Sequence, residues 1–393
     1  MAKVFVSCDE YIYRCNGRYY ARSKDKYDFY HRYTRVFEQM RLAVRCEDVD
    51  TVPENYVPMD EDPAVELYPL PIFHGPKEYA HRYFETGRVM RGAVKGCDAA
   101  ILRLPSTVAQ RFVKQIWRCG IPYALEIVYD SYDGAMCMKR WYNRLLWLRI
   151  DKKVRRACYK ADGVSCVTEH YLQQRYFSKK NPHFEGYYSS LSLDRSFFSS
   201  ARIYPEKDTL TIAHVSNQIG LHSRKGTDIV MQALSKLKKE GVVLNVIFAG
   251  DDWSGATAKI MAYARELDIE DQVSCPGFLS RKQMNDLLDN SDLYVMPTKA
   301  EGLPRVVIEA IAKGLPTVTA PASGTPELIP AEYLVEYSDV DGLAEKIRRL
   351  ATNKDAYEEA SRTNFNHSLE YEASILQARR DEFYGKLKKL AEK

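Results

Sequence analysis

No stretch of this 393-residue sequence approaches the roughly 20 consecutive apolar residues that a membrane-spanning helix needs. The nine cysteines show no regular spacing: they are scattered, and no pair has CxxC spacing. We therefore expect reduced, mostly buried thiols in a cytosolic protein, with neither a disulfide framework nor a zinc site. The start, MAKVFVSC, is too short and too weakly apolar for a secretory signal and predicts a first strand over residues 3–8.

Charge and pattern divide the chain into two halves. Residues 1–200 contain 32 Lys and Arg against 24 Asp and Glu, whereas residues 201–393 contain 25 against 29. A basic half joined to an acidic half indicates different roles. Apolar periodicity fails between residues 192 and 207, so we expect domains at 1–195 and 208–365 and a closing polar helix over 366–393.

The C-terminal half alternates short apolar runs with longer amphipathic stretches. The pattern predicts strands over 209–216, 243–252, 272–278, 292–298 and 315–320, and helices over 227–240, 256–267, 281–290 and 304–313. Such alternation is typical of βαβ units in a parallel sheet. Ligands of these sheets bind at the carboxyl ends of the strands, where residues 216–220, 250–252, 277–278 and 299–303 would form one pocket.

The N-terminal half also fits an α/β sheet, though a less regular one. Its pattern predicts further strands over 97–105, 123–130 and 163–168, and helices over 30–40 and 140–161.

The segment EGLPRVVIEA, residues 301–310, is the most informative in the chain. A buried-strand pattern precedes it, a Gly-Leu-Pro turn follows Glu301, and Pro304 stands near the first turn of a helix. Free N–H groups and the positive dipole end of a helix N-terminus suit a phosphate. Glu301 in the turn and Glu309 about two turns on would accept hydrogen bonds from sugar and ribose hydroxyls. The segment predicts a nucleotide-sugar cradle; the alternative is a surface glutamate, a capped helix and a salt-bridged glutamate.

From about residue 209 to residue 329 the sequence resembles the donor-binding domain of retaining GT-B glycosyltransferases of family 4. The resemblance rests on HVSNQIGLHSRKGTDIVMQAL, VIFAG, VSCPGFLSRKQMNDLLDNSDLYVMPTKAEGLPRVVIEAIAKGLPTVTA and GTPELI, in the expected order. It implies an α/β GT-B fold, in which two facing Rossmann-like domains hold the active site in the cleft between them. It also implies that the last helix crosses back to the N-terminal domain.

The resemblance implies a role for each matching residue. Lys225 matches the lysine that binds the donor diphosphate, and Glu301 matches the glutamate that faces the donor sugar, so these two are the expected catalytic residues. Further donor-binding residues are implied at Gly277 and Phe278 beside the base, Gly302 and Leu303 through their N–H groups, and Glu309 at the ribose.

One loop departs from the family pattern. The family usually has an arginine early in the loop before the lysine, whereas here the loop begins Ser-Asn-Gln. Either Arg224 supplies the second charge, or Asn217 and its neighbour Gln218 supply neutral hydrogen bonds.

Membership would imply a retaining hexosyltransferase-type reaction on a nucleotide-diphosphate sugar, without cofactor or metal. Cations and N–H donors aimed at the diphosphate stabilise the negative charge that builds on the leaving oxygen. We read the Asp251-Asp252 pair at a strand end as a turn or helix cap rather than a metal site. Glu301 and Glu309 are likewise not the acid and nucleophile of a glycoside hydrolase.

Three N-terminal residues are acceptor-side candidates. Gly17 lies where the family often has a glycine-rich loop, Asp130 follows a strand end, and His74 lies in PIFHGP. The alternatives are a surface loop, a helix cap and a solvated histidine, respectively.

A basic stretch begins at Lys139 and ends at Lys160, with nine basic positions, one acidic position and two tryptophans. Two interpretations are open: contact with an anionic membrane surface, or a helix that packs its apolar stripe on the sheet and exposes its basic face. No base-reading motif accompanies the charge, so we expect no nucleic-acid partner.

Together these observations predict a glycosyltransferase that moves a sugar to a glycan or lipid-linked glycan in cell-surface polysaccharide biosynthesis. We expect it in the cytoplasm, peripheral on the inner face of the membrane. The alternatives are a catalytically weak nucleotide-binding scaffold and a nucleotide-sugar epimerase on the same double fold.

Overall fold

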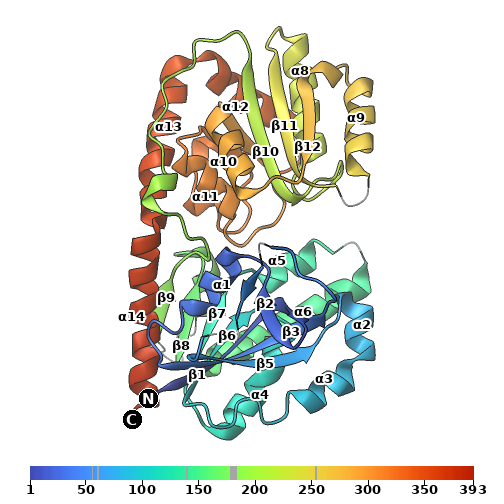
Figure 1. Cartoon of the computed structure of the whole chain (residues 1–393). Coiled ribbons are helices and arrows are strands. Elements are labelled where there is room, and N and C mark those ends of the chain that lie inside the picture. The colour runs from blue at the N-terminus through green and yellow to red at the C-terminus, as the bar shows by residue number, and fades with distance from the viewer. Residues whose placement is uncertain (55, 60–61, 139, 178–183, 253–254) are drawn as a thin grey trace. The chain divides into compact units, whose positions relative to one another are not determined.

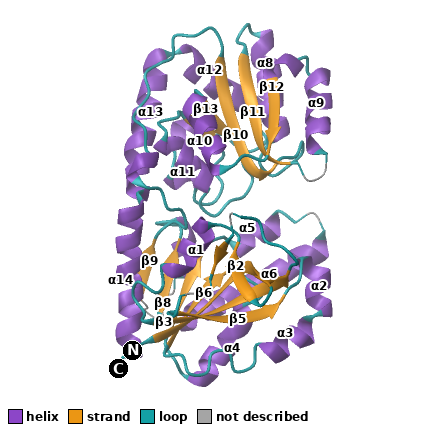
Figure 2. Cartoon of the chain, in the orientation of Figure 1, coloured by secondary structure: helices purple, strands orange, loops and turns teal. Residues whose placement is uncertain are grey.

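The computed structural model describes residues 1–54, 56–59, 62–138, 140–177, 184–252 and 255–393. The chain forms two compact units: unit 1 comprises Met1–Tyr188 with Gln377–Lys393, and unit 2 comprises Ser189–Leu376. Unit 2 therefore begins and ends at other residues than the 208 and 365 expected from the sequence. In both units, helices cover a sheet on its two faces (Figures 1 and 2).

The described part of unit 1 contains nine strands in one sheet. Seven are parallel in the order β5-β3-β1-β6-β7-β8-β9, while β2 and β4 pair antiparallel beside the end of β1. The strands are β1 (Lys3–Cys15), β2 (Arg18–Ala21), β3 (Gln39–Asp48), β4 (Val57–Pro58), β5 (Val65–Pro71), β6 (Ala99–Leu104), β7 (Tyr123–Ile127), β8 (Gly163–Cys166) and β9 (Phe184–Tyr187). The helices are α1 (Lys24–His31), α2 (Gly75–His81), α3 (Tyr83–Val89), α4 (Ala109–Cys119), α5 (Ser131–Met136), α6 (Trp141–Lys160) and α7 (Tyr171–Tyr176).

Two expectations for this half are wrong. The helix over 30–40 is absent: α1 ends at His31, and Gln39 begins β3, which lies between β1 and β5. Residues 32–38 form turns and bends, and Gln39 and Met40 already pair in the sheet, so the helix ends after its first residues. The first strand also continues beyond Cys8 to Cys15, past a bulge between Ser7 and Tyr11.

Unit 2 contains a parallel sheet in the order β12-β11-β10-β13-β14. Its strands and its first four helices agree with the expected ones within a few residues, because the period-2 and period-3.6 patterns are unambiguous there. Two further helices, over 340–352 and 354–368, were not expected. The strands are β10 (Leu210–Gln218), β11 (Leu244–Asp251), β12 (Val273–Gly277), β13 (Leu293–Met296) and β14 (Thr317–Thr319). The helices are α8 (Thr227–Lys239), α9 (Ala256–Glu266), α10 (Arg281–Asn290), α11 (Arg305–Ala312), α12 (Val340–Thr352) and α13 (Lys354–Ser368).

The expected single helix over 366–393 is two helices. Helix α13 ends at Ser368, a short 3-10 turn follows, and α14 (Ala373–Ala391) begins after Glu372, whose backbone is extended. The N–H of Ala373 donates to the carbonyl of Leu193 (2.8 Å), which draws the start of α14 onto the first segment of unit 2. From Gln377 onward α14 belongs to unit 1.

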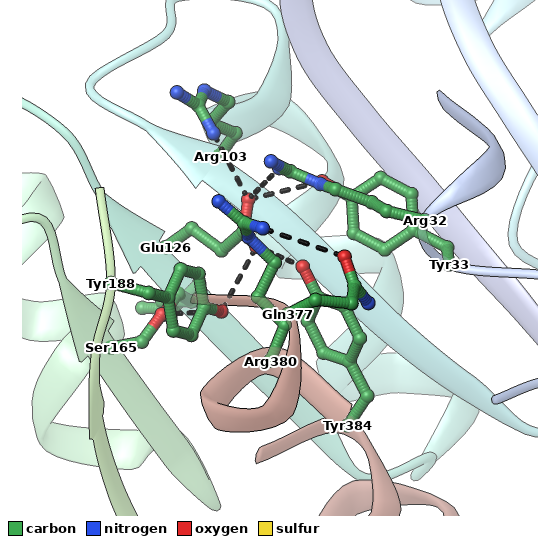
Figure 3. A network of polar contacts seen from close by, with 10 residues as sticks. Arg32, Tyr33, Arg103, Glu126, Ser165, Tyr188, Gln377, Arg380 and Tyr384 are labelled. Carbon is green, nitrogen blue, oxygen red and sulfur yellow. Dashed lines mark hydrogen bonds and ion pairs between the residues drawn. The ribbon is translucent and has the colours of Figure 1, made fainter. Parts of the chain in front are cut away.

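A buried carboxylate on β7 joins α14 to the sheet of unit 1 (Figure 3). Glu126 accepts hydrogen bonds on Oε2 from Arg32 (2.8 Å), Tyr33 (3.0 Å) and Arg103 (3.3 Å), and on Oε1 from Tyr188 (3.0 Å) and Tyr384. Burial alone would raise the pKa of this carboxyl, but the two arginines outweigh it and hold the pKa at about 2. The last helix is thus fixed by a charged group, beyond its apolar packing.

Candidate functional site

The strand order of unit 2 defines where a ligand binds. Numbered along the chain, the order is third, second, first, fourth, fifth, so it reverses between β10 and β13. In doubly wound sheets the crevice outside the carboxyl ends of the strands at this switch point holds the ligand. The loop after β10 contains Lys225 and the loop after β13 contains Glu301, so the two expected catalytic residues flank the switch point.

A glycine at the start of α8 brings these two loops into contact. Gly226 has φ +76°, and a Cβ there would lie 2.6 Å from the carbonyl oxygen of Pro297. The N–H of Lys299 donates to the carbonyl of Arg224 (2.8 Å), which adds a backbone bond between the loops. The position of Lys225 is therefore set by backbone contacts on both sides.

Lys225 and Glu301 form a direct ion pair, with Nζ donating to Oε1. Thr298, at the end of β13, stands beside it: its hydroxyl lies 3.4 Å from Glu301 Oε1 and 3.3 Å from the carbonyl oxygen of Arg224. Both charged side chains are partly exposed, at 26% for Lys225 and 18% for Glu301, so a ligand can reach them.

Two opposing effects act on the pKa of Lys225. Burial, and then the neighbouring Arg224, lower the pKa of Lys225 to about 8. The Glu301 carboxylate in contact with the ammonium favours the charged form, so Lys225 is a cation at neutral pH. Beneath it, His214 on β10 is fully buried, and this burial lowers its pKa to about 4, which keeps the imidazole neutral.

The turn after Glu301 leads into α11 as expected. Gly302 and Leu303 are buried, Pro304 is the N-cap, and the first N–H groups of the helix have no partner inside it. Free N–H donors and the positive dipole end of a helix suit an anion. Glu309, further along α11, is half-buried. Burial raises the pKa of Tyr294, and the charge of Glu309 raises it further.

Other expected donor residues lie at strand ends of the same sheet. Gly277 ends β12 with φ +79°, and Phe278 after it is 76% exposed, so its ring is open to a planar partner. Asn217 is exposed but belongs to β10, which extends to Gln218, rather than to a loop. Arg224 is exposed, and its effect on the pKa of Lys225 shows that its charge acts at the pair.

Three positions of this site were not anticipated as functional. Thr298 and Pro297 hold the two loops together, and Tyr337 donates its hydroxyl to the carbonyl of Ser223 (3.1 Å). The signal for Thr298 was present, since a threonine ends an otherwise apolar strand. Nothing near Tyr337 in the sequence points to a loop more than a hundred residues away.

The acidic pair at the end of β11 has a local role. Asp252 accepts a hydrogen bond from the N–H of Ala256, the first residue of α9. Bonds from Thr257 lower the pKa of its carboxyl. These hydrogen bonds from the first residues of α9 to Asp252 agree with its interpretation as a helix cap.

The acceptor-side candidates lie in unit 1. Gly17 (φ +81°) and Asn16 (φ +50°) form the two-residue turn of the β1–β2 hairpin, so the expected surface loop is a hairpin tip. His74 precedes α2, and its ring lies edge-on to Tyr11 with centroids 5.9 Å apart. Asp130 is buried and caps α5 through the N–H of Tyr132 (2.8 Å).

Known proteins resemble this chain in sequence and in fold. Residues 202–367 match the family model described as "Glycosyl transferases group 1". CapJ of Staphylococcus aureus is 24% identical over 365 residues, which cover 92% of this chain and 90% of that protein. WcaL of Escherichia coli K12, described as a putative colanic acid biosynthesis glycosyltransferase, is 28% identical over 169 residues, 40% of each chain. The structure of Anabaena HepE in complex with UDP and glucose superposes with a TM-score of 0.65 at 14% identity, over 97% of this chain and 99% of that one.

The fold is that of the GT-B glycosyltransferases, which confirms the fold expected from the sequence. Over residues 202–367 the chain is similar to the group 1 glycosyl transferases.

Proposed function

We propose that the protein transfers a sugar, with retention of anomeric configuration and without a metal ion, from a nucleotide-diphosphate sugar to a glycan or lipid-linked glycan. The product would be a cell-surface polysaccharide. The observation that carries this proposal is the Lys225–Glu301 pair beside the N-terminus of α11 at the switch point of unit 2. The similarity to WcaL supports the polysaccharide assignment.

The residues suggest a division of work. The Lys225 ammonium and the N–H groups at the start of α11 would hold the diphosphate and stabilise the charge that develops on the leaving oxygen. Glu301 would then release Lys225 and accept hydrogen bonds from the donor sugar. Glu309 would accept from the ribose, and the exposed ring of Phe278 would lie against the base.

Donor binding and turnover test this proposal together. UDP, GDP, ADP and their glucose and mannose conjugates would be screened by thermal shift with magnesium and with EDTA, since a ligand stabilises the state that binds it. We expect one nucleotide family to raise the Tm in both buffers and its conjugate to be hydrolysed slowly, with the released sugar initially in the donor's anomeric form by NMR. Binding without hydrolysis would favour the scaffold, conversion of the sugar without release would favour the epimerase, and a strict magnesium requirement would contradict metal-free transfer.

We further propose that α6 rests on an anionic membrane surface at the cytoplasmic face. Nothing in its first ten residues is fully buried, and Trp141 (73%), Tyr142 (46%), Leu145 (44%) and Leu146 (46%) are exposed. Seven Lys and Arg lie on the helix, whereas its one acidic residue, Asp151, is buried and paired with Arg155. Apolar rings among cations are typical of interfacial helices.

The packing alternative for this stretch applies to the second half of the helix, where Val154, Ala157 and Cys158 are buried. Lys139, the first residue of the stretch, lies outside the described residues. No helix in the described part of the chain is long and apolar enough to cross a membrane.

Vesicle co-sedimentation checks the membrane proposal. The wild type should sediment with phosphatidylglycerol vesicles at low salt and less with phosphatidylcholine vesicles, because each Lys or Arg near an anionic surface contributes about 1 kcal/mol. Trp141→Ser combined with Leu145→Ser should abolish sedimentation. Phe84→Ser on α3, which removes a ring that is 83% exposed elsewhere in unit 1, is the matched control and should sediment as the wild type does. Equal binding to both vesicle types would contradict the proposal.

A further inference from the structure

Unit 1 contains an aromatic surface that the donor site does not use. The strand β1 continues for seven residues beyond Cys8. Its pairing with β6 is limited to Val4–Ser7, and its last residues, Tyr13–Cys15, pair with β2. Tyr11 and Tyr13 lie on this extension, on the same face of the strand, since successive side chains alternate. The extension thus presents two aromatic rings on one face.

These rings gather with side chains from other segments. The ring centroids of Tyr11 and Tyr13 are 5.6 Å apart, and those of Tyr13 and Tyr56 are 5.0 Å apart. Arg22 donates to the hydroxyl of Tyr11 (3.0 Å), and the ring of His74 stands edge-on to the same tyrosine. All three tyrosines are half-buried, so each ring is supported from below and still reaches the surface.

The position within the sheet is that of a ligand site. In the parallel register Tyr11 pairs with Arg45 and Tyr13 with Glu47 on β3, and Cys46 pairs with Pro71, the last residue of β5. The cluster therefore stands at the carboxyl ends of three neighbouring parallel strands, the edge at which open α/β sheets bind ligands.

The charges around the rings are balanced. Arg45 is paired with Asp9 (3.1 Å between Nη2 and Oδ1), and the Glu47 carboxylate lies 3.7 Å from the His74 ring. The formal charges of Arg22 and Arg45 equal those of Asp9 and Glu47 in number. A surface without net charge gives no field that would select an anion or a cation. Tyrosine offers an apolar ring with a polar tip, which matches a sugar ring with its C–H face and hydroxyl rim.

We propose that Tyr11, Tyr13 and Tyr56 form a stacking platform for a neutral sugar residue of the acceptor glycan, with Arg22 and His74 as hydrogen-bonding groups at its edge. The proposal rests on the function proposed above, because a glycan acceptor is what such a platform would hold. It also gives a common location to two of the acceptor-side candidates, since the Gly17 turn closes this hairpin and His74 contacts Tyr11.

Saturation-transfer NMR on the full-length protein tests the platform. The probes are neutral disaccharides of glucose, galactose, mannose and N-acetylglucosamine in α and β linkages, with digalacturonic acid as the anionic comparison. We expect at least one neutral disaccharide to receive saturation on its ring protons and digalacturonic acid to receive none. Tyr13→Ala should reduce the signal roughly fivefold, as expected from the loss of one ring contact, and Tyr13→Phe should restore it.

Tyr19 supplies the matched control. It pairs with Arg14 across the hairpin and so lies on the face opposite Tyr13, while being half-exposed like the platform tyrosines. Tyr19→Ala should leave the saccharide signal unchanged, and a thermal melt of each variant verifies that unit 1 is folded. Absence of signal from every neutral disaccharide, a signal from the anionic sugar alone, or equal loss in Tyr19→Ala would overturn the proposal.

Nucleotide binding, measured in the same samples by thermal shift, separates this inference from the donor function. All of these substitutions are in unit 1, whereas the donor-site residues are in unit 2. Nucleotide binding without saccharide binding would overturn the platform and leave the donor function standing. Saccharide binding to a wild type that binds no nucleotide would support the platform and overturn the donor function.

Discussion

The ammonium of Lys225 is in contact with the carboxylate of Glu301 across the switch point of the unit 2 sheet. The two residues are far apart in the sequence and come from the loops after β10 and β13. Each is expected to contact a different part of the donor, the diphosphate and the sugar. The two side chains favour each other's charged form. On the proposed function, donor binding would exchange this pair for two new contacts.

The first prediction concerns how much each expected donor contact contributes to the rate of turnover. Lys225→Ala, Glu301→Ala and Glu309→Ala should each lower the rate of donor turnover roughly ten- to a hundredfold, because a hydrogen bond to a charged group contributes about 1.5–3 kcal/mol. Steady-state kinetics with the nucleotide sugar found by thermal shift would measure it. Glu266→Ala, an exposed glutamate at the end of α9, is the control and should turn over normally. Wild-type rates in all three variants would contradict the site.

The second prediction is a pH dependence of nucleotide binding. Burial and Arg224 lower the pKa of Lys225 to about 8, so in the wild type the ammonium should lose its charge as the pH rises through 8, and the affinity for the nucleoside diphosphate should fall between pH 7 and 9. In Glu301→Gln, which removes the carboxylate that favours the ammonium, the same fall should begin at a lower pH. Titration calorimetry at several pH values measures the affinity. A flat profile in this variant would show that Lys225 does not contact the diphosphate.

The third prediction uses two glycines with the same backbone conformation. Gly226 (φ +76°) and Gly255 (φ +64°) are both N-cap residues with a left-handed backbone. Alanine at either position should therefore cost about 1–2 kcal/mol of backbone strain. Only at Gly226 would the new Cβ meet another chain segment, the Pro297 carbonyl at 2.6 Å. Gly226→Ala should therefore also displace Lys225 and weaken nucleotide binding, whereas Gly255→Ala should only lower the Tm. Equal nucleotide affinity in both variants would contradict the role of Gly226.

Local patterns were sufficient to predict the sheet of unit 2 and the helices between its strands, whereas α12 and α13 were not expected. Its strands and helices have clear periods, and a proline-started helix after a glycine turn defines the anion position without tertiary information. The contact between Lys225 and Glu301 was not predictable from spacing, because it depends on the strand order and on the Gly226–Pro297 approach.

Unit 1 was harder to predict for physical reasons. The expected helix over 30–40 is mostly a turn segment that leads into β3, and β3 is defined by its pairing with β1 and β5, which local spacing does not show. The extension of β1 depends on pairing with β2 through an Asn-Gly turn, a signal that stands in the sequence as a hairpin marker. Asp130 was considered both as an acceptor contact and as a helix cap, and it caps α5; its acceptor role stays a prediction.

The fourth prediction concerns the buried imidazole of His214. Its pKa is lowered from 6.5 to about 4 in the folded state, so between these values the unfolded chain binds more protons and folding weakens as the pH falls. Between pH 6.5 and 5 the loss should be about 2 kcal/mol of unfolding free energy. His214→Asn, which lacks this titration, should lose less over the same interval. Urea unfolding of both proteins at the two pH values measures the difference, and parallel losses would show that His214 is not the group responsible.

The last prediction concerns the helix that joins unit 1 after Gln377. Tyr384→Phe removes a hydroxyl that donates to the buried Glu126 carboxylate, so unit 1 should lose about 1.5–3 kcal/mol. Tyr333→Phe is the matched comparison, since its equally buried hydroxyl donates to a neutral carbonyl, that of Ala356 (3.3 Å), and should cost unit 2 about 0.5–1.5 kcal/mol. Hydrogen exchange measures each loss within its own unit, through the protection of β7 and of α13. A larger loss for Tyr333→Phe would mean that the carboxylate does not anchor α14, and that the apolar contacts of Phe383 with Phe184 hold the helix instead.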